Sequence, residues 1–561
     1  MGPGDLGEYT SQPMTSTAAQ PALLTCLRTN ATRAGIHLTD ADMARVASSS
    51  FLSHIDHFTR LMARFPPETI PDLLKDWHDA GSNESVEAVL AVPTERAAAT
   101  DPLDPFAPLH VVAAAIADRT VSPVALTELM LERIARHDPT LNAYQLLLTD
   151  RARVAAAEAE REIAGGHYRG SFHGLPVAVK DLLVTAGLPT TAGSKILADW
   201  VPDADAEAVR RLKEGGAIII GKTRMSEFAY SPGSDNAHYG PTRNPWHLER
   251  DTGGSSSGSA AAVAAGLAYM ALGSDTGCSI RAPSALCGLV GLKPTHGRIS
   301  LAGTVTLSWS LDHLGPMVRS VRDAALALNL LAGYDPRDRR TRQDTVPNFA
   351  AALDHPGGVR GLRIGAVRDD GSPLDPPDPE ATAAWEAGLR ALRDAGASVV
   401  DLALPELEDL RVIASAIITL EGVAYHEPSL RDRPQDFGQS LRDSLPIAYA
   451  YGPNAYVQAQ QGRAVLRARL DRLWERVDLL STPAVAYGAP PLGEARHNTR
   501  FAMPFNCLGW PAIVVPTGLT REGLPLSTQI IGRPWDEITV LRGAQAVERR
   551  GPWGTRHAPG F

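Results

Sequence analysis

Apolar residues near the N-terminus recur at alternating steps of four and three. The five positions are Phe51, Ile55, Phe58, Met62 and Phe65. This spacing predicts a helix with one apolar stripe, because residues three and four apart lie on the same helical face. A helical unit this small cannot bury the stripe by itself, so we expect it to dock on a larger domain.

Further along the chain, short apolar runs alternate with helical patterns. The runs LPVAVK and AIIIGKT suit buried strands, whereas DAEAVRRLKEGG is typical of a helix that ends in glycine. This alternation predicts an α/β domain with a mostly buried sheet. A preceding stretch rich in Pro, Ala and acidic residues is typical of a linker. We therefore expect a disordered tail over 1–20, a helical unit over 21–78, a linker over 79–108 and the α/β domain over 109–555.

The composition is that of a soluble globular protein. The chain has 561 residues, too many for one compact core, of which 44% are apolar and 21% charged. A net charge of −9 gives no general attraction for nucleic acid or anionic membranes. The first residues lack a secretory-signal pattern, and no apolar run reaches the roughly 20 residues of a membrane-spanning helix. The four cysteines form no CxxC pair, so we expect a cytoplasmic protein with neither disulfides nor a metal site.

Candidate chemistry is concentrated around DTGGSSSGSAAAVAAG, residues 251–266. Serines before an alanine run suit a helix cap, whereas a phosphate-binding loop is disfavoured because no Lys follows the glycines. Upstream, Lys180 ends an apolar strand, and downstream Ser279 lies in a turn that contains glycine. Burial that lowers the pKa of a lysine from about 10.4 makes it a usable base, and a serine within reach of a base becomes a nucleophile. Together these residues suit a serine hydrolase without histidine.

Several sequence blocks resemble the amidase signature family. In chain order they are GLPVAVKD, GKTRMSEFAY, NPWHLERDTGGSSSGSAAAVAAG, GSDTGCSIRAPSALCGLVGLKPTHGRIS, PFNCLGWPAIVVPTG and GLPLSTQIIGRPWDE. The resemblance implies the amidase signature fold, a large mixed β-sheet between helices, with the small helical unit added at the N-terminus. It also implies a catalytic triad: Lys180 as base, Ser255 after a cis peptide bond as proton relay, and Ser279 as nucleophile. The implied reaction cleaves a carboxylic amide through an acyl-enzyme and uses no cofactor.

Residues beside the triad are assigned supporting roles. The expected oxyanion hole consists of the backbone N–H groups of Thr276, Gly277, Cys278 and Ser279. Cys278 stands where the family usually has a second glycine, so a positive φ at this position would carry strain. Asp275 and Arg281 are expected to brace the turn. Ser256 and Ser257 are expected to cap the next helix or to bond locally.

Substrate contacts are expected from residues in the same blocks. They are Phe228, Tyr230, Gly253, Gly254, Trp309 and Phe505. The aromatic side chains favour a hydrophobic or aryl-bearing group. We expect a small-molecule amide or carbamate as substrate and neither nucleic acid nor membrane as partner, and we leave a homodimer open.

The N-terminal segment carries a second resemblance. Its sequence GIHLTDADMARVASSSFLSHIDHFTRLMARF is similar to the small helical subunit of tRNA-dependent amidotransferases and to helical partners of some bacterial amidases. The leading interpretation is a hydrolase of carboxylic amides, and the same triad suits a carbamate or urea hydrolase. The alternative from a second class is a glutaminase-type subunit of a tRNA-dependent amidotransferase. That subunit would need a partner with the acceptor and an ATP site, because the sequence has no nucleotide-binding motif.

Overall fold

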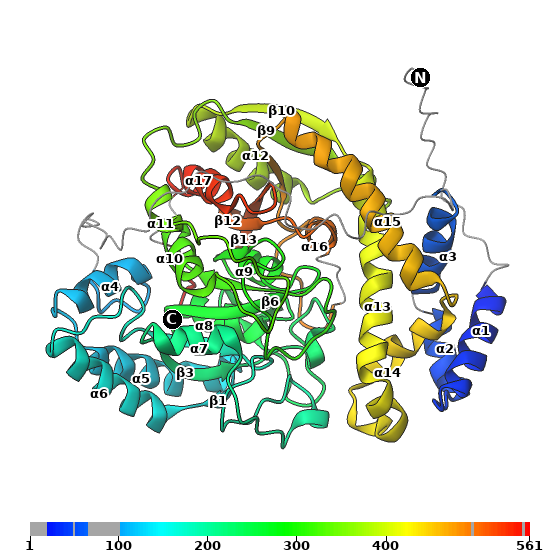
Figure 1. Ribbon diagram of the computed structural model, residues 1–561, viewed down its shortest axis with the longest axis horizontal. Coiled ribbons are helices and arrows are strands. Elements are labelled where there is room, and N and C mark those ends of the chain that lie inside the picture. The colour runs from blue at the N-terminus through cyan, green and yellow to red at the C-terminus, as the bar shows by residue number, and fades with distance from the viewer. Residues whose placement is uncertain (1–19, 49–50, 66–100, 495–498, 552–555) are drawn as a thin grey trace.

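A computed structural model of the chain describes residues 20–48, 51–65, 101–494, 499–551 and 556–561. Almost all of the expected tail, and residues 79–100 of the expected linker, lie outside these ranges. The described residues form a main body of sheet and helices, with three further helices at one end (Figure 1).

The main body is built on one sheet of 11 strands among the described residues. In spatial order the strands are β1 (Tyr144–Leu147), β3 (Ile218–Thr223), β2 (Pro176–Lys180), β6 (Met270–Asp275), β8 (His313–Val318), β7 (Val290–Lys293), β12 (Ala512–Leu519), β13 (Pro525–Gly532), β11 (Leu479–Pro483), β9 (Arg363–Asp369) and β10 (Ser398–Ala403). Strand β2 is parallel to β3 and β6, whereas β6, β8, β7, β12, β13 and β11 pair antiparallel in turn. The expected α/β class with a large mixed sheet is therefore confirmed. A separate hairpin is formed by β4 (Arg243–Asn244) and β5 (His247–Asp251).

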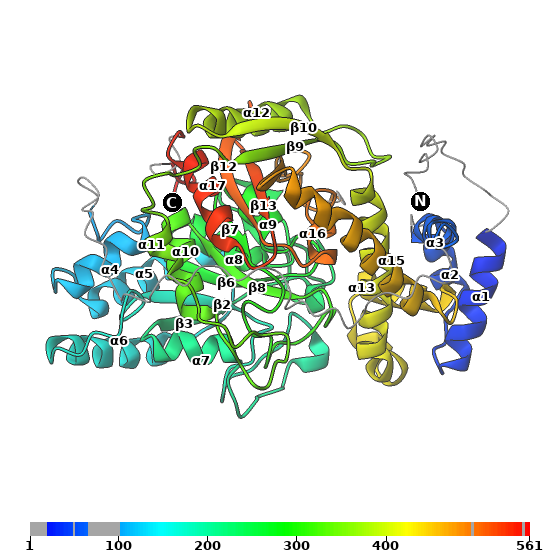
Figure 2. The ribbon, with the colours of Figure 1, turned by 45° about the horizontal axis from the view of Figure 1, so that its top comes forward.

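Helices surround this sheet (Figure 2). The α-helices of the main body are α4 (Leu109–Ala117), α5 (Pro123–Leu141), α6 (Thr149–Ala164), α7 (Glu207–Glu214), α8 (Ser257–Ala264), α9 (Arg281–Leu286), α10 (Val321–Leu331), α11 (Phe349–Ala352), α12 (Pro379–Asp394), α13 (Glu406–Asp432), α14 (Gln439–Ser444), α15 (Ala455–Leu470), α16 (Met503–Cys507) and α17 (Glu537–Glu548). Short 3₁₀ helices are η1 (Lys195–Leu197), η2 (Glu227–Ala229), η3 (Pro434–Asp436), η4 (Leu445–Ala450) and η5 (Asp471–Glu475). None of the described helices combines the length and the apolarity needed to cross a membrane.

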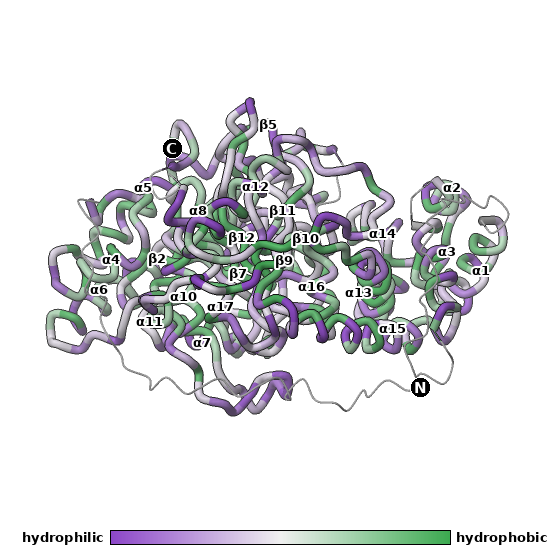
Figure 3. The backbone as a smooth tube through the Cα atoms, turned by 90° about the horizontal axis from the view of Figure 1, so that it is seen from above, coloured by the Kyte–Doolittle hydropathy of each residue, from purple (hydrophilic) through white to green (hydrophobic). Residues whose placement is uncertain are grey.

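The elements that carry the candidate site lie in the interior. Strand β2 reads PVAVK and helix α8 reads SGSAAAVA, and every residue of both is buried. Small side chains let α8 pack closely on the strands: a Cβ at Gly258 would lie 2.1 Å from the backbone oxygen of Ala143. Hydrophobic segments of the backbone run along the sheet in the interior (Figure 3). The sequence thus places polar site residues at the ends of buried elements.

The three remaining helices are α1 (Gln20–Arg33), α2 (Asp40–Ser48) and α3 (Phe51–Met62), and they pack against α13, α15, α14 and η4 (Figures 1 and 2). Three residues of the predicted stripe, Ile55, Phe58 and Met62, are buried in this contact. The ring of Phe58 meets that of Tyr451 edge to face, with 5.4 Å between centroids. Fully burying one such side chain is worth about 1.5–3 kcal/mol. The stripe therefore holds the N-terminal helices against the main body.

Candidate active site

Lys180 lies at the end of β2 and is fully buried. Its Nζ is 2.6 Å from Ser255 Oγ, 3.0 Å from Ser256 Oγ and 2.9 Å from Ser274 Oγ. Two of these hydroxyls come from the turn that begins α8, and the third comes from β6, the neighbour of β2 in the sheet. The ammonium or amine group is thus surrounded by hydroxyl oxygens rather than by a carboxylate partner.

Burial lowers the pKa of Lys180 to about 7, and the negative charges of Asp275 and Asp312 oppose this shift only in part. The loss of hydration penalises the charged ammonium, and hydroxyl groups replace little of that hydration energy. A lysine with this pKa is neutral in a large fraction of molecules at neutral pH. Its Nζ can therefore accept a proton from a neighbouring hydroxyl.

The turn that carries Ser255 depends on two glycines. The peptide bond between Gly254 and Ser255 is cis, and Gly253 has φ of +73°. A Cβ at Gly254 would lie 2.0 Å from the backbone oxygen of Gly233, and one at Gly253 would lie 3.1 Å from backbone atoms of Pro283. Gly254 is required because the neighbouring backbone leaves no space for a side chain, and glycine is favoured at position 253 because its φ is positive. The structure thus gives these two glycines, expected as substrate contacts, a role in shaping the turn.

The expected caps at the start of α8 are not formed. Helix α8 begins at Ser257, and its N-cap residue Ser256 makes no side-chain capping bond. The Ser256 hydroxyl instead accepts from Lys180 Nζ and donates to the backbone oxygen of Ser274 at 3.2 Å. Sequence reasoning missed both Ser256 and Ser274 as partners of the lysine. The signal available was strand pairing, because β2 and β6 are adjacent and Ser274 lies near the end of β6.

Ser279 lies in the turn between the end of β6 and the start of α9, and 6% of its surface is exposed. The four residues from Thr276 to Ser279 are consecutive in this turn. Within the described part of the chain, none of their backbone N–H groups donates a hydrogen bond to a protein acceptor. Buried N–H groups normally find partners. Such a row of free donors suits the binding of a negatively charged oxygen.

Cys278 occupies its position in this turn without backbone strain. It is not among the described residues with positive φ, so its Cβ is tolerated. The side chain packs in a cluster of small apolar residues that includes Ala282 and Ala502. Burial, followed by the charge of Asp275, raises the pKa of the Cys278 thiol to about 12. Because the thiolate rather than the thiol is the nucleophile, this pKa disfavours Cys278 as the nucleophile at neutral pH.

Asp275 and Arg281 brace the two ends of the turn. Both are fully buried, and the guanidinium makes two bonds to the carboxylate, at 2.9 and 3.0 Å. Burial raises the pKa of Asp275, but the guanidinium outweighs this effect and brings the pKa to about 2. Asn506 from α16 donates to the same carboxylate at 2.8 Å, and Gln529 from β13 accepts from the guanidinium at 2.9 Å. The network ties the turn to two distant segments of the chain.

The four aromatic residues expected to contact substrate differ in their surroundings. Phe228 is buried in the main core, with its ring 4.2 Å from that of His426 between centroids. Phe505 is fully buried in a different apolar cluster. Tyr230 lies beside α13, whereas Trp309 is 43% exposed. Membership in a motif does not reveal which way a side chain faces, so the substrate contacts expected at these positions stay a prediction.

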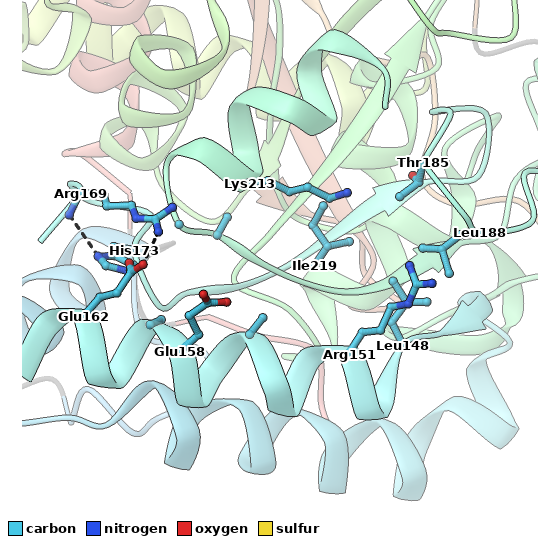
Figure 4. Close-up of a pocket in the computed structure, with 14 residues that line it drawn as sticks. Leu148, Arg151, Glu158, Glu162, Arg169, His173, Thr185, Leu188, Lys213 and Ile219 are labelled. Atoms are coloured by element: carbon cyan, nitrogen blue, oxygen red, sulfur yellow. Dashed lines mark hydrogen bonds and ion pairs between the residues drawn. The ribbon is translucent and has the colours of Figure 1, made fainter. Parts of the chain in front are cut away.

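A cavity of about 270 Å³ lies away from these residues, between α6, α7 and the chain after β2 (Figure 4). Both apolar and charged side chains line it. Arg169 and His173 both pair with Glu162, and Lys213 pairs with Asp205. Neither Lys180 nor the serines of the candidate site line this cavity. Because none of the three candidate triad residues lines it, this cavity is not the candidate active site.

Comparisons with known proteins place this geometry in a family. The family model described as Amidase matches residues 125–541. One subunit of the glutamyl-tRNA(Gln) amidotransferase of Chloroflexus aurantiacus is 40% identical over 474 residues, covering 79% of this chain and 96% of the relative. One similar solved structure is of a vestigial protein complex that reveals the evolutionary origins of an s-triazine catabolic enzyme. It has a TM-score of 0.75 and 36% sequence identity, and the match covers 79% of this chain and 98% of the chain in that structure. The structure of the peptide amidase of Stenotrophomonas maltophilia has a TM-score of 0.71 and 33% sequence identity, and the match covers 81% of this chain and 98% of that chain.

The expected partners of the chain were wrong. We expected a small-molecule substrate and no nucleic acid, but relatives matched over nearly their whole length are named as subunits of an amidotransferase of glutamyl-tRNA(Gln). The expectation rested on the net charge of −9. Net charge describes the electrostatic potential of this chain alone. It carries no information about which molecules the partner subunits of an assembly bind.

The family model spans most of the chain, and the relatives and solved structures agree with it. The mixed sheet with surrounding helices is the fold of these amidase signature enzymes. Members of this group act on amide C–N bonds, and so does this enzyme. The chain belongs to the amidase family, as the resemblance of its sequence blocks predicted.

Proposed function

We propose that this chain is the glutaminase-type subunit of a tRNA-dependent amidotransferase and cleaves an amide with Ser279 as nucleophile. The observation that carries the chemistry is the surroundings of Lys180. Three hydroxyls lie within 3.0 Å of its Nζ, and burial brings its pKa to about 7. A neutral amine beside a serine hydroxyl is the base that a histidine-free serine enzyme requires.

The first half of the reaction forms an acyl-enzyme. Ser255 gives its proton to neutral Lys180 and takes the proton of Ser279 as the Ser279 oxygen attacks the amide carbonyl carbon. The carbonyl oxygen becomes negatively charged and is held by the N–H groups of the turn from Thr276 to Ser279. When the tetrahedral intermediate collapses, the C–N bond breaks. The proton returns by the same route to the leaving nitrogen, which departs as ammonia.

The second half restores the enzyme. Water attacks the ester carbonyl and gives a proton to Ser255, which passes one to Lys180. The bond from Ser279 to the acyl group then breaks, and the proton returns to the Ser279 oxygen. The carboxylic acid leaves, and neither a metal ion nor a cofactor enters any of these steps.

The amidotransferase assignment is supported by the relatives and by the N-terminal helices. The Chloroflexus relative, which shares 40% identity, is named as one of the subunits of such an enzyme. The N-terminal sequence resembles the small helical subunit of these enzymes, and its helices α1–α3 pack on α13, α14, α15 and η4 of the same chain. In this role the ammonia freed from glutamine serves as the nitrogen donor for glutamyl-tRNA, which a separate partner holds and activates.

The test separates amide cleavage from nitrogen transfer. The tagged chain is isolated from its own cells with its partners, and conversion of glutamyl-tRNA(Gln) to glutaminyl-tRNA is followed by mass spectrometry. We expect glutamine to support conversion by the wild type but not by Ser279→Ala, and ammonium chloride to support conversion by both. Vigorous amide hydrolysis by the isolated chain, with no conversion in any fraction, would contradict the assignment.

A second candidate function is hydrolysis without transfer. The peptide amidase of Stenotrophomonas maltophilia covers 81% of this chain at a TM-score of 0.71, and its name describes a hydrolytic enzyme. The same triad suits the carbonyl of a carbamate or urea. A panel of glutamine, peptide amides, aryl amides and carbamates, with amine release measured for the chain alone, distinguishes these reactions. Rapid turnover of any of them without partner or ATP favours this candidate.

A further inference from the structure

One stretch of helix α13 contacts three separate segments of the chain: the start of α16, the end of η2 and the loop that contains Trp309. Ser415 Oγ donates to the sulfur of Met503 at 3.5 Å. Thr419 forms a hydrogen bond with Tyr230. Glu421 accepts from the loop that contains Trp309. The same helix packs against α3 of the N-terminal unit, so α13 lies between that unit and the site (Figure 2).

Glu421 makes the strongest of these contacts. Only 1% of its surface is exposed. Its carboxylate accepts from Ser308 Oγ at 2.5 Å, from Ser310 Oγ at 2.6 Å and from Ser310 N at 3.2 Å. Tyr456 of α15 donates to it at 2.7 Å. A buried carboxylate with four donors is fully satisfied, and it fixes the backbone that supplies them.

A second buried carboxylate continues this path to the nucleophile turn. Asp312 accepts from the backbone N–H groups of Leu307 and Ser308 at 3.0 and 3.1 Å, and from Thr306 Oγ1 at 2.8 Å. It also accepts from Thr276 Oγ1 at 2.6 Å. Thr276 is the first residue of the row of free N–H groups. Ser308 is therefore bonded to both carboxylates, and the loop joins Glu421 to the turn.

The same loop also lines a narrow hollow beside the turn. Its walls include Leu307 and Asp312 from the loop and Thr304 and Val305 just before it, together with Ser274 and Thr276. Ser274 bonds to Lys180. A displacement of the loop would therefore shift the N–H donors of the oxyanion turn and would change the shape of the hollow next to Lys180.

We propose that Glu421 is a positioning residue for the reaction: through the loop from Thr306 to Asp312 it fixes Thr276 and the oxyanion turn. The proposal rests on the proposed role of Ser279. Misplacing a reacting group by about 1 Å costs on the order of 10²-fold in rate. Glu421→Ala removes all four bonds, so we expect the reaction at Ser279 to slow by about 10²-fold. Glu421→Gln keeps one oxygen, and its amide can donate to rotated hydroxyls, so we expect a loss within about tenfold.

The reaction at Ser279 is measured without knowing the natural substrate. A fluorophosphonate places its phosphoryl oxygen where the oxyanion forms, and Ser279 displaces fluoride to give a covalent adduct that mass spectrometry locates. The second-order labelling rate is compared for the full-length wild type, Glu421→Ala and Glu421→Gln. Glu408→Gln is the matched control, because Glu408 is a buried glutamate of the same helix that pairs with Arg411 instead of the loop. We expect this control to label within about twofold of the wild type.

A double-mutant cycle distinguishes positioning from general damage. Thr276→Val removes the hydroxyl that bonds to Asp312 and keeps the backbone N–H. If Glu421 acts through Thr276, the double variant Glu421→Gln with Thr276→Val labels no more than about twofold slower than the slower single variant. If the fold-reduction in labelling rate of the double variant equals the product of the two single fold-reductions, the proposal is overturned. If Glu421→Ala is not recovered folded, the double variant Ser308→Ala with Ser310→Ala removes two of the same bonds, those of the two hydroxyls, from the side of the loop.

The outcomes separate this inference from the proposed function. A wild type that is not labelled at Ser279 overturns the proposed nucleophile. A wild type that is labelled, with Glu421→Ala labelled at the same rate and an unchanged kcat for amide cleavage, overturns only the positioning role. The expected result is a fall in labelling and in kcat with KM within about threefold, because the bound substrate is held but the oxyanion is not.

Discussion

Lys180 and Lys222 lie on neighbouring strands, β2 and β3, and both side chains are fully buried. Lys222 is 2.9 Å from a carboxylate oxygen of Asp181 and also donates to the backbone oxygen of Pro189 at 3.0 Å. Lys180 contacts three serine hydroxyls and has no carboxylate in contact with it among the described residues. Burial lowers the pKa of both lysines, but only Lys222 has an ion-pair partner that favours its charged form. The comparison teaches that the partner, more than burial, separates a structural lysine from a candidate base.

Replacing Lys180 tests the comparison most severely. Lys180→Met removes the base and fills its apolar surroundings with a side chain of similar length. A positioned base contributes about 10²–10⁴-fold to a rate, and we expect kcat for amide cleavage to fall by about 10³–10⁴-fold. The free energy of unfolding should change little, because no charged partner is left behind. Residual activity above a tenth of the wild type would show that another group is the base.

Replacing Lys222 should have the opposite outcome. Lys222→Met leaves the Asp181 carboxylate buried without its ion pair, and breaking a buried pair in this way costs about 3–5 kcal/mol. We expect the denaturant midpoint to fall accordingly, while the activity per folded molecule stays within about threefold. The two variants control for each other, because they remove the same side chain from adjacent strands. A large loss of kcat with unchanged stability would reverse the two roles.

The pH dependence sharpens the same contrast. The base must be neutral, so kcat/KM should rise with pH and level off above the pKa of Lys180, which is about 7. Lys180→Met should lack this limb, whereas Lys222→Met should keep it. The free energy of unfolding should also rise with pH. Between pH 7 and the ordinary lysine pKa of 10.5, the unfolded chain binds a proton at Lys180 that the folded chain does not. Raising the pH through this window should therefore stabilise the wild type relative to Lys180→Met.

These lysines also show what the sequence could and could not predict. The pattern of a lysine at the end of an apolar strand occurs three times, at Lys180, Lys222 and Lys293, and all three side chains are fully buried. Periodicity predicted the strands and the α/β class, but it could not select one lysine. The sequence blocks around Lys180 and the serine stretch made the selection, and the structure then placed Ser255 2.6 Å from its Nζ.

Contacts between distant segments were beyond the sequence. Ser274 meets Lys180 because β6 lies beside β2, and strand order is not written in a local pattern. Phe228 and Phe505 lie in the expected motifs but face two different apolar clusters. Glu421 reaches the loop at Ser308 from 113 residues away, with no motif to mark it. What depends on register and packing had to be seen in three dimensions.

Removing one hydroxyl from Lys180 should give an intermediate effect. Ser256→Ala deletes an acceptor 3.0 Å from Nζ, and acceptors favour the charged form of a lysine. Its loss should lower the pKa further and move the rising limb of kcat/KM toward acid pH, with kcat reduced about tenfold. Ser257→Ala is the matched control, since Ser257 is the next buried serine and does not contact the amine. An unshifted limb in Ser256→Ala would mean that this hydroxyl does not hold the lysine.

The smallest effect is expected at Cys278. Among the groups that shift the pKa of Lys180, Cys278 makes the smallest contribution. Cys278→Gly keeps the backbone N–H in the turn and removes a thiol that contacts the Gly254 carbonyl at 3.8 Å and forms a hydrogen bond with the Ser279 side chain. We expect kcat within about threefold and an unmoved pH limb, with a loss of about 1–2 kcal/mol in stability from the buried side chain. Cys287→Gly is the matched control for packing, because this second buried thiol donates to the Thr252 carbonyl at 3.7 Å. A loss near 10³-fold in Cys278→Gly alone, comparable with the loss of an oxyanion donor, would place the thiol among the groups that act on the reacting atoms.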